Sequence, residues 1–310
     1  MDEGGVLPRV MQPLTIFEAL TWAGEKIKAA EPARVLGARN PKLDAQVLLA
    51  ACLDKPTSYL FAHGEEVLDE TVIERFMRLI ERRARHEPVA YLLGQKDFYR
   101  RTFAVSPATL IPRPDTELLV DLVRQDIGNN TMIVDVGTGS GAIAITLAAE
   151  TGAEVIATDI SAEALKIASA NAQTHEVGDH VAFLQGNLLK PFFETYNTWN
   201  PEAKPDSLLI VANLPYLTGR QWEALDPDVK DYEPQTALVG GLDGLEFYDE
   251  LLMQLAARRK DLPRGVKIFF EIDPAQGSAA QSLIRHYFPE TSPEVIRDLA
   301  GNWRFITACL

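Results

Sequence analysis

The feature that most constrains the fold is a glycine-rich turn between a strand-like and a helix-like segment. Residues 133–141 read IVDVGTGSG, and an apolar stretch expected to be helical at 141–150 follows. Glycines let the backbone approach a ligand closely, and a helix N-terminus offers unpaired N–H groups. The spacing is neither the G-x-G-x-x-G of dinucleotide folds nor a phosphate-binding loop, which needs a following G-K-[S/T]. We expect a nucleotide-like ligand here, with a merely tight turn as the alternative. The candidate binding residues are Gly137, Thr138, Gly139, Ser140 and Gly141.

The second half of the chain alternates short apolar runs with helical stretches, which is typical of a doubly wound α/β sheet. The predicted buried strands are 131–136, 153–159, 181–185, 207–212 and 266–272, and the predicted helices are 116–126, 141–150, 161–174, 247–261 and 275–287. Two further runs, 294–299 and 303–309, flank Gly301 with no room for a helix between them. We therefore predict a seven-stranded sheet that ends in an antiparallel hairpin.

The first half has a different pattern. From Thr15 to about Glu87 the apolar residues recur at helical spacing, which predicts an all-helical domain. From 89 to 110, aromatic and β-branched residues alternate with turn residues, which predicts a β-hairpin-like connector. The expected organisation is a helical domain at 14–88, the connector at 89–110 and the sheet domain at 111–310.

Composition excludes several classes of protein. With 30 Lys plus Arg against 44 Asp plus Glu, the net charge of −14 argues against general electrostatic attraction to nucleic acid as the main source of affinity. Two distant cysteines and five scattered histidines show no metal-ligand spacing, so we expect no metal. We find neither an apolar stretch long enough to cross a bilayer nor a secretory or transit signal, and we expect a cytoplasmic protein with no membrane association.

An acidic residue follows the glycine-rich turn at the end of the next predicted strand. The carboxylate of Asp159 can accept hydrogen bonds from two ribose hydroxyls at that strand end. The alternative is that Asp159 or Ser161 simply caps the following helix. Together the turn and this acid resemble the S-adenosylmethionine site of class I methyltransferases.

A second motif, Asn213-Leu214-Pro215-Tyr216, follows the predicted strand 207–212. It resembles the [N/D]-P-P-[Y/F] motif of methyltransferases that modify a nitrogen conjugated to a π-system. Such a nitrogen is a poor nucleophile, so positioning must replace activation. The Asn213 side chain and the Leu214 carbonyl can each accept one N–H, while Pro215 favours an extended Leu214 and Tyr216 packs on the flat amide. The alternative is a strand end turned by Asn and Pro.

Further segments resemble the HemK-type family of release factor glutamine methyltransferases over nearly the whole chain. They lie at 44–49, 85–94, 97–99, 110–120, 232–241 and 298–301. The resemblance implies transfer of a methyl group from S-adenosylmethionine to the N5 atom of the glutamine in the Gly-Gly-Gln motif of class I peptide chain release factors, with the helical domain helping to dock this protein substrate. It also implies that residues 112–117, with Arg113, Pro114 and Glu117, lie beside the methionine part of the cofactor. Helix capping by Asp115 and Thr116 is the alternative role of that segment.

The sequence departs from the family pattern at three places. Leu214 stands where a proline is usual, which removes a fixed φ angle and is expected to loosen the loop. Asn187 stands where an acid often meets the adenine amino group, and Leu188 follows where an aromatic residue is common; the Asn187 amide oxygen can still accept a hydrogen bond. Asp273 replaces a small residue.

Two other functions are compatible with these motifs. An adenine-N6 methyltransferase acting on DNA or RNA meets the same lone-pair problem and could use the same tetrapeptide on a flipped base. A non-catalytic protein of the same fold, whose helical domain binds a translation factor, would explain the Leu214 departure. The net charge and the 110–120 segment argue against the first of these.

Overall fold

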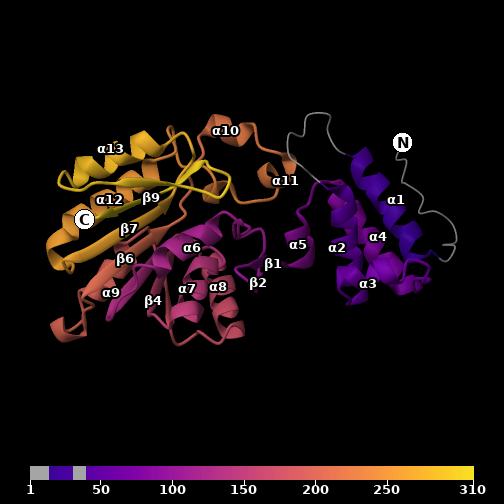
Figure 1. Cartoon of the computed structure of the whole chain (residues 1–310), viewed down its shortest axis with the longest axis horizontal. Coiled ribbons are helices and arrows are strands. Elements are labelled where there is room, and N and C mark those ends of the chain that lie inside the picture. The colour runs from indigo at the N-terminus through magenta and orange to yellow at the C-terminus, as the bar shows by residue number, and fades with distance from the viewer. Residues whose placement is uncertain (1–13, 31–39) are drawn as a thin grey trace. The chain divides into compact units, whose positions relative to one another are not determined.

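The computed structural model describes residues 14–30 and 40–310. Predictions that fall on 1–13 and 31–39, including the signal-free N-terminus and part of the helical domain, lie outside the described residues. The chain divides into two compact units, which Figure 1 shows as ribbons. The first comprises the chain up to Leu93 together with Asp226–Tyr232, and the second comprises Gly94–Leu225 and Glu233–Leu310. The first boundary thus lies inside the expected connector, and a short downstream segment packs with the first unit, which a contiguous division does not anticipate.

The first unit is helical. Its elements are α1 (Ile16–Ala29), α2 (Pro41–Leu53), α3 (Thr57–Ala62), α4 (Glu70–Ala84), α5 (Val89–Leu93) and the short α11 (Pro227–Lys230). A capping box between Thr15 and Glu18 starts α1 by satisfying N–H groups that the helix leaves unpaired. The nearly buried guanidinium of Arg83 pairs with Asp44 at 2.7 Å and ties α4 to α2. The Tyr232 hydroxyl donates to the Arg85 carbonyl at 2.7 Å and anchors the 226–232 segment.

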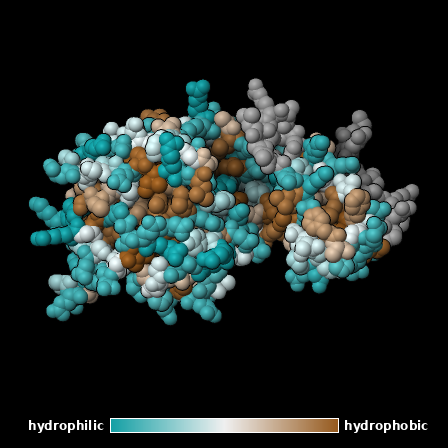
Figure 2. Space-filling model, in the orientation of Figure 1, coloured by the Kyte–Doolittle hydropathy of each residue, from teal (hydrophilic) through white to brown (hydrophobic). Residues whose placement is uncertain are grey.

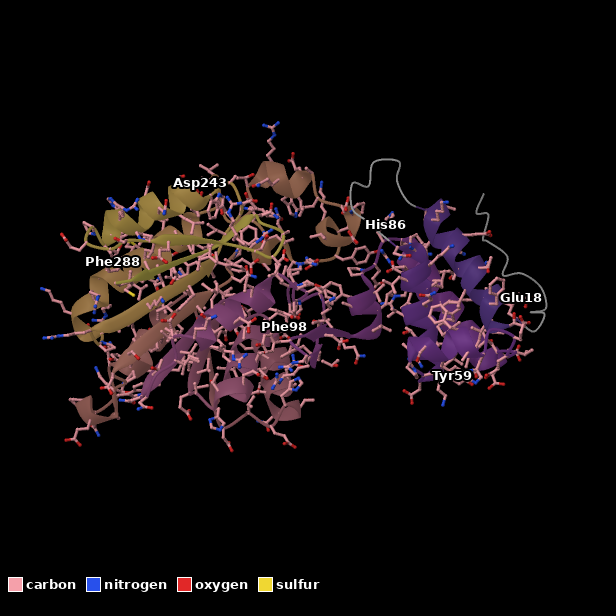
Figure 3. The ribbon with its side chains drawn as sticks, in the orientation of Figure 1. Glu18, Tyr59, His86, Phe98, Asp243 and Phe288 are labelled. Carbon is pink, nitrogen blue, oxygen red and sulfur yellow. The ribbon has the colours of Figure 1, made fainter. Side chains whose placement is uncertain are left out.

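The connector begins with a helix and continues as a hairpin. Residues 89–93 were expected to join the hairpin, but Pro88 starts the turn of α5, with its carbonyl accepting from Tyr91 and Leu92. The hairpin itself pairs β1 (Gln95–Phe98) with β2 (Arg101–Ala104) in antiparallel register. The Phe98 side chain, labelled in Figure 3, is 1% exposed. The hairpin therefore belongs to the core of the second unit.

The second unit is built on a seven-stranded sheet, as predicted, and the strand order is β5-β4-β3-β6-β7-β9-β8. Its strands are β3 (Thr131–Val136), β4 (Val155–Asp159), β5 (Val181–Gln185), β6 (Ser207–Ala212), β7 (Gly265–Glu271), β8 (Glu294–Arg297) and β9 (Trp303–Cys309). The first five are parallel, and β9 pairs antiparallel with both β7 and β8. The strand order reverses at β3 and β6, so the loops that follow these two strands meet at one edge, where ligands bind in doubly wound sheets.

Helices cover both faces of this sheet. One face packs against α6 (Thr116–Arg124), α7 (Ala142–Thr151) and α8 (Ala162–Thr174), and the other against α9 (Lys190–Tyr196), α12 (Glu246–Arg258) and α13 (Gly277–Tyr287). The remaining short elements are α10 (Gly219–Glu223), η1 (Pro201–Ala203), η2 (Gln235–Ala237) and η3 (Arg259–Asp261). Apolar residues form scattered patches among hydrophilic ones on the face seen in Figure 2. No described helix combines the length and apolarity that a membrane crossing requires.

Candidate active site

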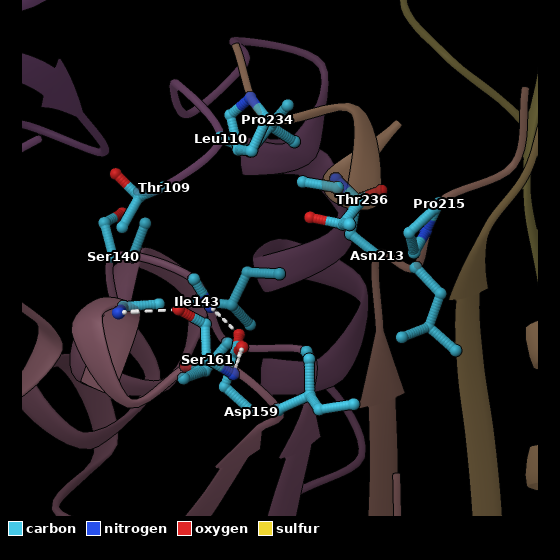
Figure 4. Close-up of a pocket in the computed structure, with 18 of the residues that line it drawn as sticks. Thr109, Leu110, Ser140, Ile143, Asp159, Ser161, Asn213, Pro215, Pro234 and Thr236 are labelled. Atoms are coloured by element: carbon cyan, nitrogen blue, oxygen red, sulfur yellow. Dashed lines mark hydrogen bonds between the residues drawn. The ribbon is translucent and has the colours of Figure 1, made fainter. Parts of the chain in front are cut away.

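A pocket of about 410 Å³ lies at the edge where the loops after β3 and β6 meet. The loop after β3 is residues 137–141, here called the glycine loop, and the loop after β6 is residues 213–216, here called the NLPY loop. Figure 4 shows Asp159 and Ser161 on one side of the pocket and Asn213 and Thr236 on the opposite side. The two motifs that the sequence singled out, 72 to 79 residues apart along the chain, therefore contribute residues to one cavity.

The glycine loop is shaped by its own backbone. Gly139 has a φ of +57° and contacts nothing within 4 Å at the place where a Cβ would stand, so its main chain faces open pocket. Its N–H donates to Asp159 Oδ2 at 2.9 Å, and the N–H of Ser161 donates to Oδ1 at 2.8 Å. Asp159 thus fixes the loop while still lining the pocket, and burial raises the pKa of its carboxyl. Ser161, not Asp159, caps α8 by accepting from Ala164.

Beneath the glycine loop lies a fully buried carboxyl. Asp135 Oδ2 accepts a hydrogen bond from the Thr138 hydroxyl at 2.6 Å. Burial raises the pKa of Asp135 to about 7, although the Thr138 hydrogen bond opposes the shift. The glycine loop is therefore held, through Thr138, by a carboxyl whose pKa is raised.

Gly141 differs from its neighbours in the loop, because it does not line the pocket. A Cβ there would stand 2.6 Å from Ile145 Cδ1 and 3.1 Å from Ala168 Cβ. Its predicted part in ligand binding is therefore replaced by a packing role, in which the missing side chain lets α8 lie close to α7.

Asn213 lines the pocket and is held from an element far away in sequence. Its Nδ2 donates to Thr116 Oγ1 at 3.2 Å, and the Thr116 hydroxyl donates to Glu271 Oε2 at 2.7 Å. Thr116 lies in the first turn of α6, and Asp115, the residue at the helix cap, makes no capping hydrogen bond through its side chain. The capping alternative for this segment is therefore wrong, because Thr116 is used at the site instead.

Leu214 is anchored through a group that proline lacks. Its N–H donates to the Tyr248 hydroxyl at 3.1 Å, and that hydroxyl in turn donates to the Glu271 carbonyl. The Leu214 side chain is 4% exposed, and its Cδ2 is 2.9 Å from where a Cβ on Gly137 would stand. The expected loosening by Leu214 is therefore not what the structure shows, because a buried hydrogen bond replaces the fixed φ angle.

The main chain of the NLPY loop packs closely on a glycine-containing segment. A Cβ on Gly240 would lie 2.1 Å from the Pro215 carbonyl oxygen, and one on Gly244 would lie 2.0 Å from that of Tyr216. Gln276 Nε2 donates to the Tyr216 carbonyl at 2.9 Å and to that of Asp243, labelled in Figure 3, at 3.0 Å. These contacts leave the loop little freedom.

Tyr216 does not lie where the sequence suggested. It is absent from the residues that line the pocket, and its hydroxyl donates to Glu271 Oε1 at 3.4 Å. Burial and the nearby Glu271 charge raise the pKa of Tyr216 well above its usual range. The structure therefore shows the Tyr216 hydroxyl held by Glu271, and packing of its ring on an acceptor amide stays a prediction.

The 112–117 segment is only partly in the site. Arg113 lines the pocket and pairs at 2.5 Å with Glu233 Oε1, whose other oxygen accepts from Ile111 N at 3.1 Å. Pro114 and Glu117 do not line it; Glu117 instead accepts from Tyr99 N at 2.9 Å and holds the hairpin turn. Sequence reasoning did not assign Glu233 a role, although the Tyr232–Gly241 segment containing it had been singled out.

The other two departures from the family pattern, the Asn187–Leu188 pair and Asp273, have different local roles. Asn187 and Leu188 line the pocket, and Asn187 Nδ2 donates to Glu250 Oε1 at 2.6 Å, which turns the amide oxygen away from that carboxylate. Asp273 accepts from Ala275 N at 2.9 Å and from Gln221 Nε2 at 3.1 Å. It therefore organises the turn after β7.

Comparison with known proteins agrees with this architecture. A family model described as the PrmC N-terminal domain matches residues 18–94, and one described as a methyltransferase domain matches 133–225. The release factor glutamine methyltransferase of Bacillus subtilis is 38% identical over 303 residues, covering 96% of this chain and 98% of that protein. That of Nitratidesulfovibrio vulgaris is 35% identical over 298 residues, covering 95% of each. The chain belongs to the release factor glutamine methyltransferase family.

Membership of this family makes the chain a methyltransferase, and a solved structure supports the fold. The catalytic domain of hMettl16 in complex with a MAT2A 3′UTR hairpin covers 67% of this chain and 74% of that chain with a TM-score of 0.51, at 17% identity. The similarity is in the class I methyltransferase fold alone. Within the described ranges 14–30 and 40–310, no group of three or more His, Cys, Asp or Glu side chains could hold a metal ion.

The pocket fits the cofactor that methyltransferases of this kind use. A nucleoside with an attached sulfonium amino acid needs an acceptor for ribose hydroxyls and a backbone that can be approached closely. Asp159 offers the first, since each carboxylate oxygen accepts one N–H and keeps a second lone pair, and Gly139 offers the second. The pocket residues that would hold S-adenosylmethionine are Gly137, Thr138, Gly139, Ser140, Asp159, Asn187, Leu188 and Asn213.

Proposed function

We propose that this chain transfers a methyl group from S-adenosylmethionine to the side-chain amide nitrogen, N5, of the glutamine in the Gly-Gly-Gln motif of class I peptide chain release factors. Family membership supports the reaction class and the protein substrate. Since release factors act on ribosomes, the proposal places the reaction in the cytoplasm.

The observation that carries the proposal is the position of the Asn213 carboxamide. Asn213 lies across the pocket from Asp159, and its Nδ2 is already committed to Thr116. Neither Asn213 Oδ1 nor the Leu214 carbonyl accepts a hydrogen bond from any described residue. Two neighbouring acceptors match a planar NH2 group, which has two N–H donors.

The protein contributes positioning to this reaction. When bound, the cofactor supplies an electrophilic methyl group on a sulfonium sulfur. Asn213 Oδ1 and the Leu214 carbonyl would each take one N–H of the acceptor amide, so that its nitrogen faces the cofactor side of the pocket. Holding reacting groups in this way is worth about 7 to 11 kcal/mol of barrier in well-aligned systems, which removes the need for a strong base.

The two alternative functions are not favoured. Full-length relatives are named for glutamine methylation of release factors, whereas the likeness to an RNA-bound methyltransferase structure is a likeness of fold. A non-catalytic role drew its support from Leu214, and that residue is anchored by Tyr248 in a fully formed loop.

The test is a labelling experiment with methyl-labelled S-adenosylmethionine. The protein is incubated separately with a release factor, its Gly-Gly-Asn variant, ribosomal RNA and duplex DNA. We expect label on the unmodified release factor alone. Label on RNA or DNA would identify a nucleic-acid methyltransferase, and no label on any substrate would favour a binding protein.

A further inference from the structure

Asn213 is linked through a second side chain to a buried carboxyl. Asn213 Nδ2 lies 3.2 Å from Thr116 Oγ1, and Thr116 Oγ1 lies 2.7 Å from Glu271 Oε2. Thr116 is 4% exposed and Glu271 2% exposed, so water does not compete for these hydrogen bonds. The three residues come from the loop after β6, from α6 and from β7, and Thr116 is 97 residues from Asn213 and 155 residues from Glu271 along the chain.

The direction of these hydrogen bonds follows from counting protons. A hydroxyl has one proton to donate, and the Thr116 hydroxyl donates it to Glu271 Oε2, which accepts in the ionised form of the carboxyl. Because Thr116 gives its proton to Glu271, toward Asn213 it can act only as an acceptor. The end of the Asn213 carboxamide that contacts Thr116 must therefore be the NH2 group, Nδ2. The oxygen, Oδ1, then points away from Thr116.

The surroundings of Glu271 favour its role as an acceptor. Tyr216 donates to its second oxygen at 3.4 Å, and Tyr248 donates to its main-chain carbonyl. Burial raises the pKa of Glu271 to about 7, and Asp115 acts in the same direction, while the Thr116 hydrogen bond, the charge of Arg304 and the Tyr216 hydroxyl favour the ionised form. Two hydroxyl donors, Thr116 and Tyr216, and one cation, Arg304, thus face this carboxyl.

We propose that Thr116 and Glu271 are positioning residues that hold the Asn213 carboxamide with Oδ1 toward the acceptor amide, an inference that rests on the proposed glutamine methylation. If the carboxamide turned over, its NH2 group would face the NH2 group of the substrate, and two donors would oppose each other. A symmetric motif side chain such as aspartate would need no such device. An asparagine needs one, because its two ends differ only in hydrogen bonding.

The kinetic test compares two substitutions at Thr116 with a matched control. Thr116→Val removes the hydroxyl at nearly constant volume, and Thr116→Ser keeps it. Thr307→Val makes the same change at a buried threonine of β9 whose hydroxyl has no partner among the described residues. We expect Thr116→Val to lower kcat about 10- to 100-fold, with S-adenosylhomocysteine affinity and the KM for release factor within about threefold, and Thr116→Ser and Thr307→Val to stay within about threefold of wild type.

A double-mutant cycle separates positioning from a general structural role. In an Asn213→Ala background, Thr116→Val and Glu271→Gln should cause no further loss of kcat, because the group that they orient is gone. Additive losses in that background would overturn the proposal. So would wild-type turnover by Thr116→Val, or failure of Thr116→Ser to restore turnover.

A spectroscopic readout keeps the inference testable apart from activity. In protein labelled with ¹⁵N at asparagine, the Asn213 side-chain resonance is identified by its loss in Asn213→Ala. Solvent exchange of its NH2 protons should accelerate at least about tenfold in Thr116→Val and stay unchanged in Thr307→Val. Unchanged exchange in Thr116→Val would overturn the proposal. A wild-type protein that methylates no release factor yet shows the expected exchange would overturn the proposed function and support the hydrogen-bond arrangement.

Discussion

The glycine loop and the NLPY loop line the same pocket, but different kinds of partner hold them in place. The glycine loop is fixed through its own main-chain N–H groups by the strand that follows it in sequence: Gly137 and Thr138 donate to the Thr158 carbonyl, and Gly139 donates to the Asp159 side chain. The NLPY loop is fixed by side chains from elsewhere, such as Thr116 and Gln276. The partners of the glycine loop therefore come from the adjacent strands β3 and β4, whereas those of the NLPY loop come from α6 and from the turn after β7.

The largest expected effect is that of Asn213→Ala. Loss of the acceptor for one N–H should lower kcat about 10²- to 10³-fold, because the remaining groups no longer aim the nitrogen. S-Adenosylhomocysteine binding by titration calorimetry should change by no more than about threefold. Equal losses of turnover and cofactor affinity would show that Asn213 does not act on the acceptor amide alone and also contributes to cofactor binding.

Gly240→Ala tests whether the NLPY loop depends on close packing from behind. A methyl group there would overlap the Pro215 carbonyl oxygen, so the loop must shift, and kcat should fall about 10- to 50-fold. Gly152→Ala is the control, since Gly152 has a φ of +69° but open space around the added Cβ. That variant should lose about 1 kcal/mol of unfolding free energy by denaturant titration and keep its kcat. Matching kcat values for the two variants would contradict the role of Gly240.

Asp159→Ala tests the opposite side of the pocket. Removing the carboxylate takes away the ribose acceptor and the anchor of Gly139, so S-adenosylhomocysteine affinity should fall about 10-fold. At saturating cofactor, kcat should stay within about threefold of wild type. If kcat fell as steeply as affinity, Asp159 would be organising the acceptor side as well.

The smallest expected effect is a pH dependence of the free energy of unfolding, which arises from one buried carboxyl near each loop: Asp135 near the glycine loop and Glu271 near the NLPY loop. Burial raises the pKa of Asp135 and Glu271 to about 7, from ordinary values of 3.8 and 4.5. The folded protein therefore holds more protons than the unfolded chain below about pH 7, and stability falls as pH rises toward that value. Each carboxyl should contribute about 1 kcal/mol of this decline between about pH 6 and about pH 7.

Asp135→Asn and Glu271→Gln, measured by denaturant titration at several pH values, should each flatten the pH dependence by that amount. Glu163→Gln, a change at an exposed carboxyl on α8, serves as the control. A wild-type stability that rises over the same pH range would contradict both shifts.

The fold could be predicted from the sequence wherever a pattern is local. The strands 131–136, 181–185 and 207–212 are confirmed at those residues, and the terminal hairpin is confirmed as β8 and β9. The helix α9 was missed, because Lys190–Tyr196 is short and aromatic and does not show a clear helical period. The helix α5 was missed because its residues read as β-formers until Pro88 is recognised as the start of a helical turn.

The site could be predicted where a motif supplies its own partners. The glycine loop and Asp159 lie within one strand–helix–strand unit, so their proximity follows from local sequence. Glu271 contacts Thr116 and Tyr248, which lie 155 and 23 positions away along the chain. The spacing of these residues in the sequence does not predict either contact. The contact between the Tyr216 hydroxyl and Glu271 was not predicted for the same reason, because the two residues are 55 positions apart.

The short segment Asp226–Tyr232 has a consequence for dissecting this protein. The polypeptide passes between the units at Leu93, at Leu225 and again at Tyr232. Cleavage after Leu93 would therefore release residues 1–93 from residues 94–310, but the 226–232 segment, which packs with the first unit, would stay on the larger fragment. Deletion of residues 1–93 would also remove the residues against which α11 and Tyr232 pack. The shortened protein would then contain an unpacked segment at 226–232, so the second unit cannot be isolated by simple truncation.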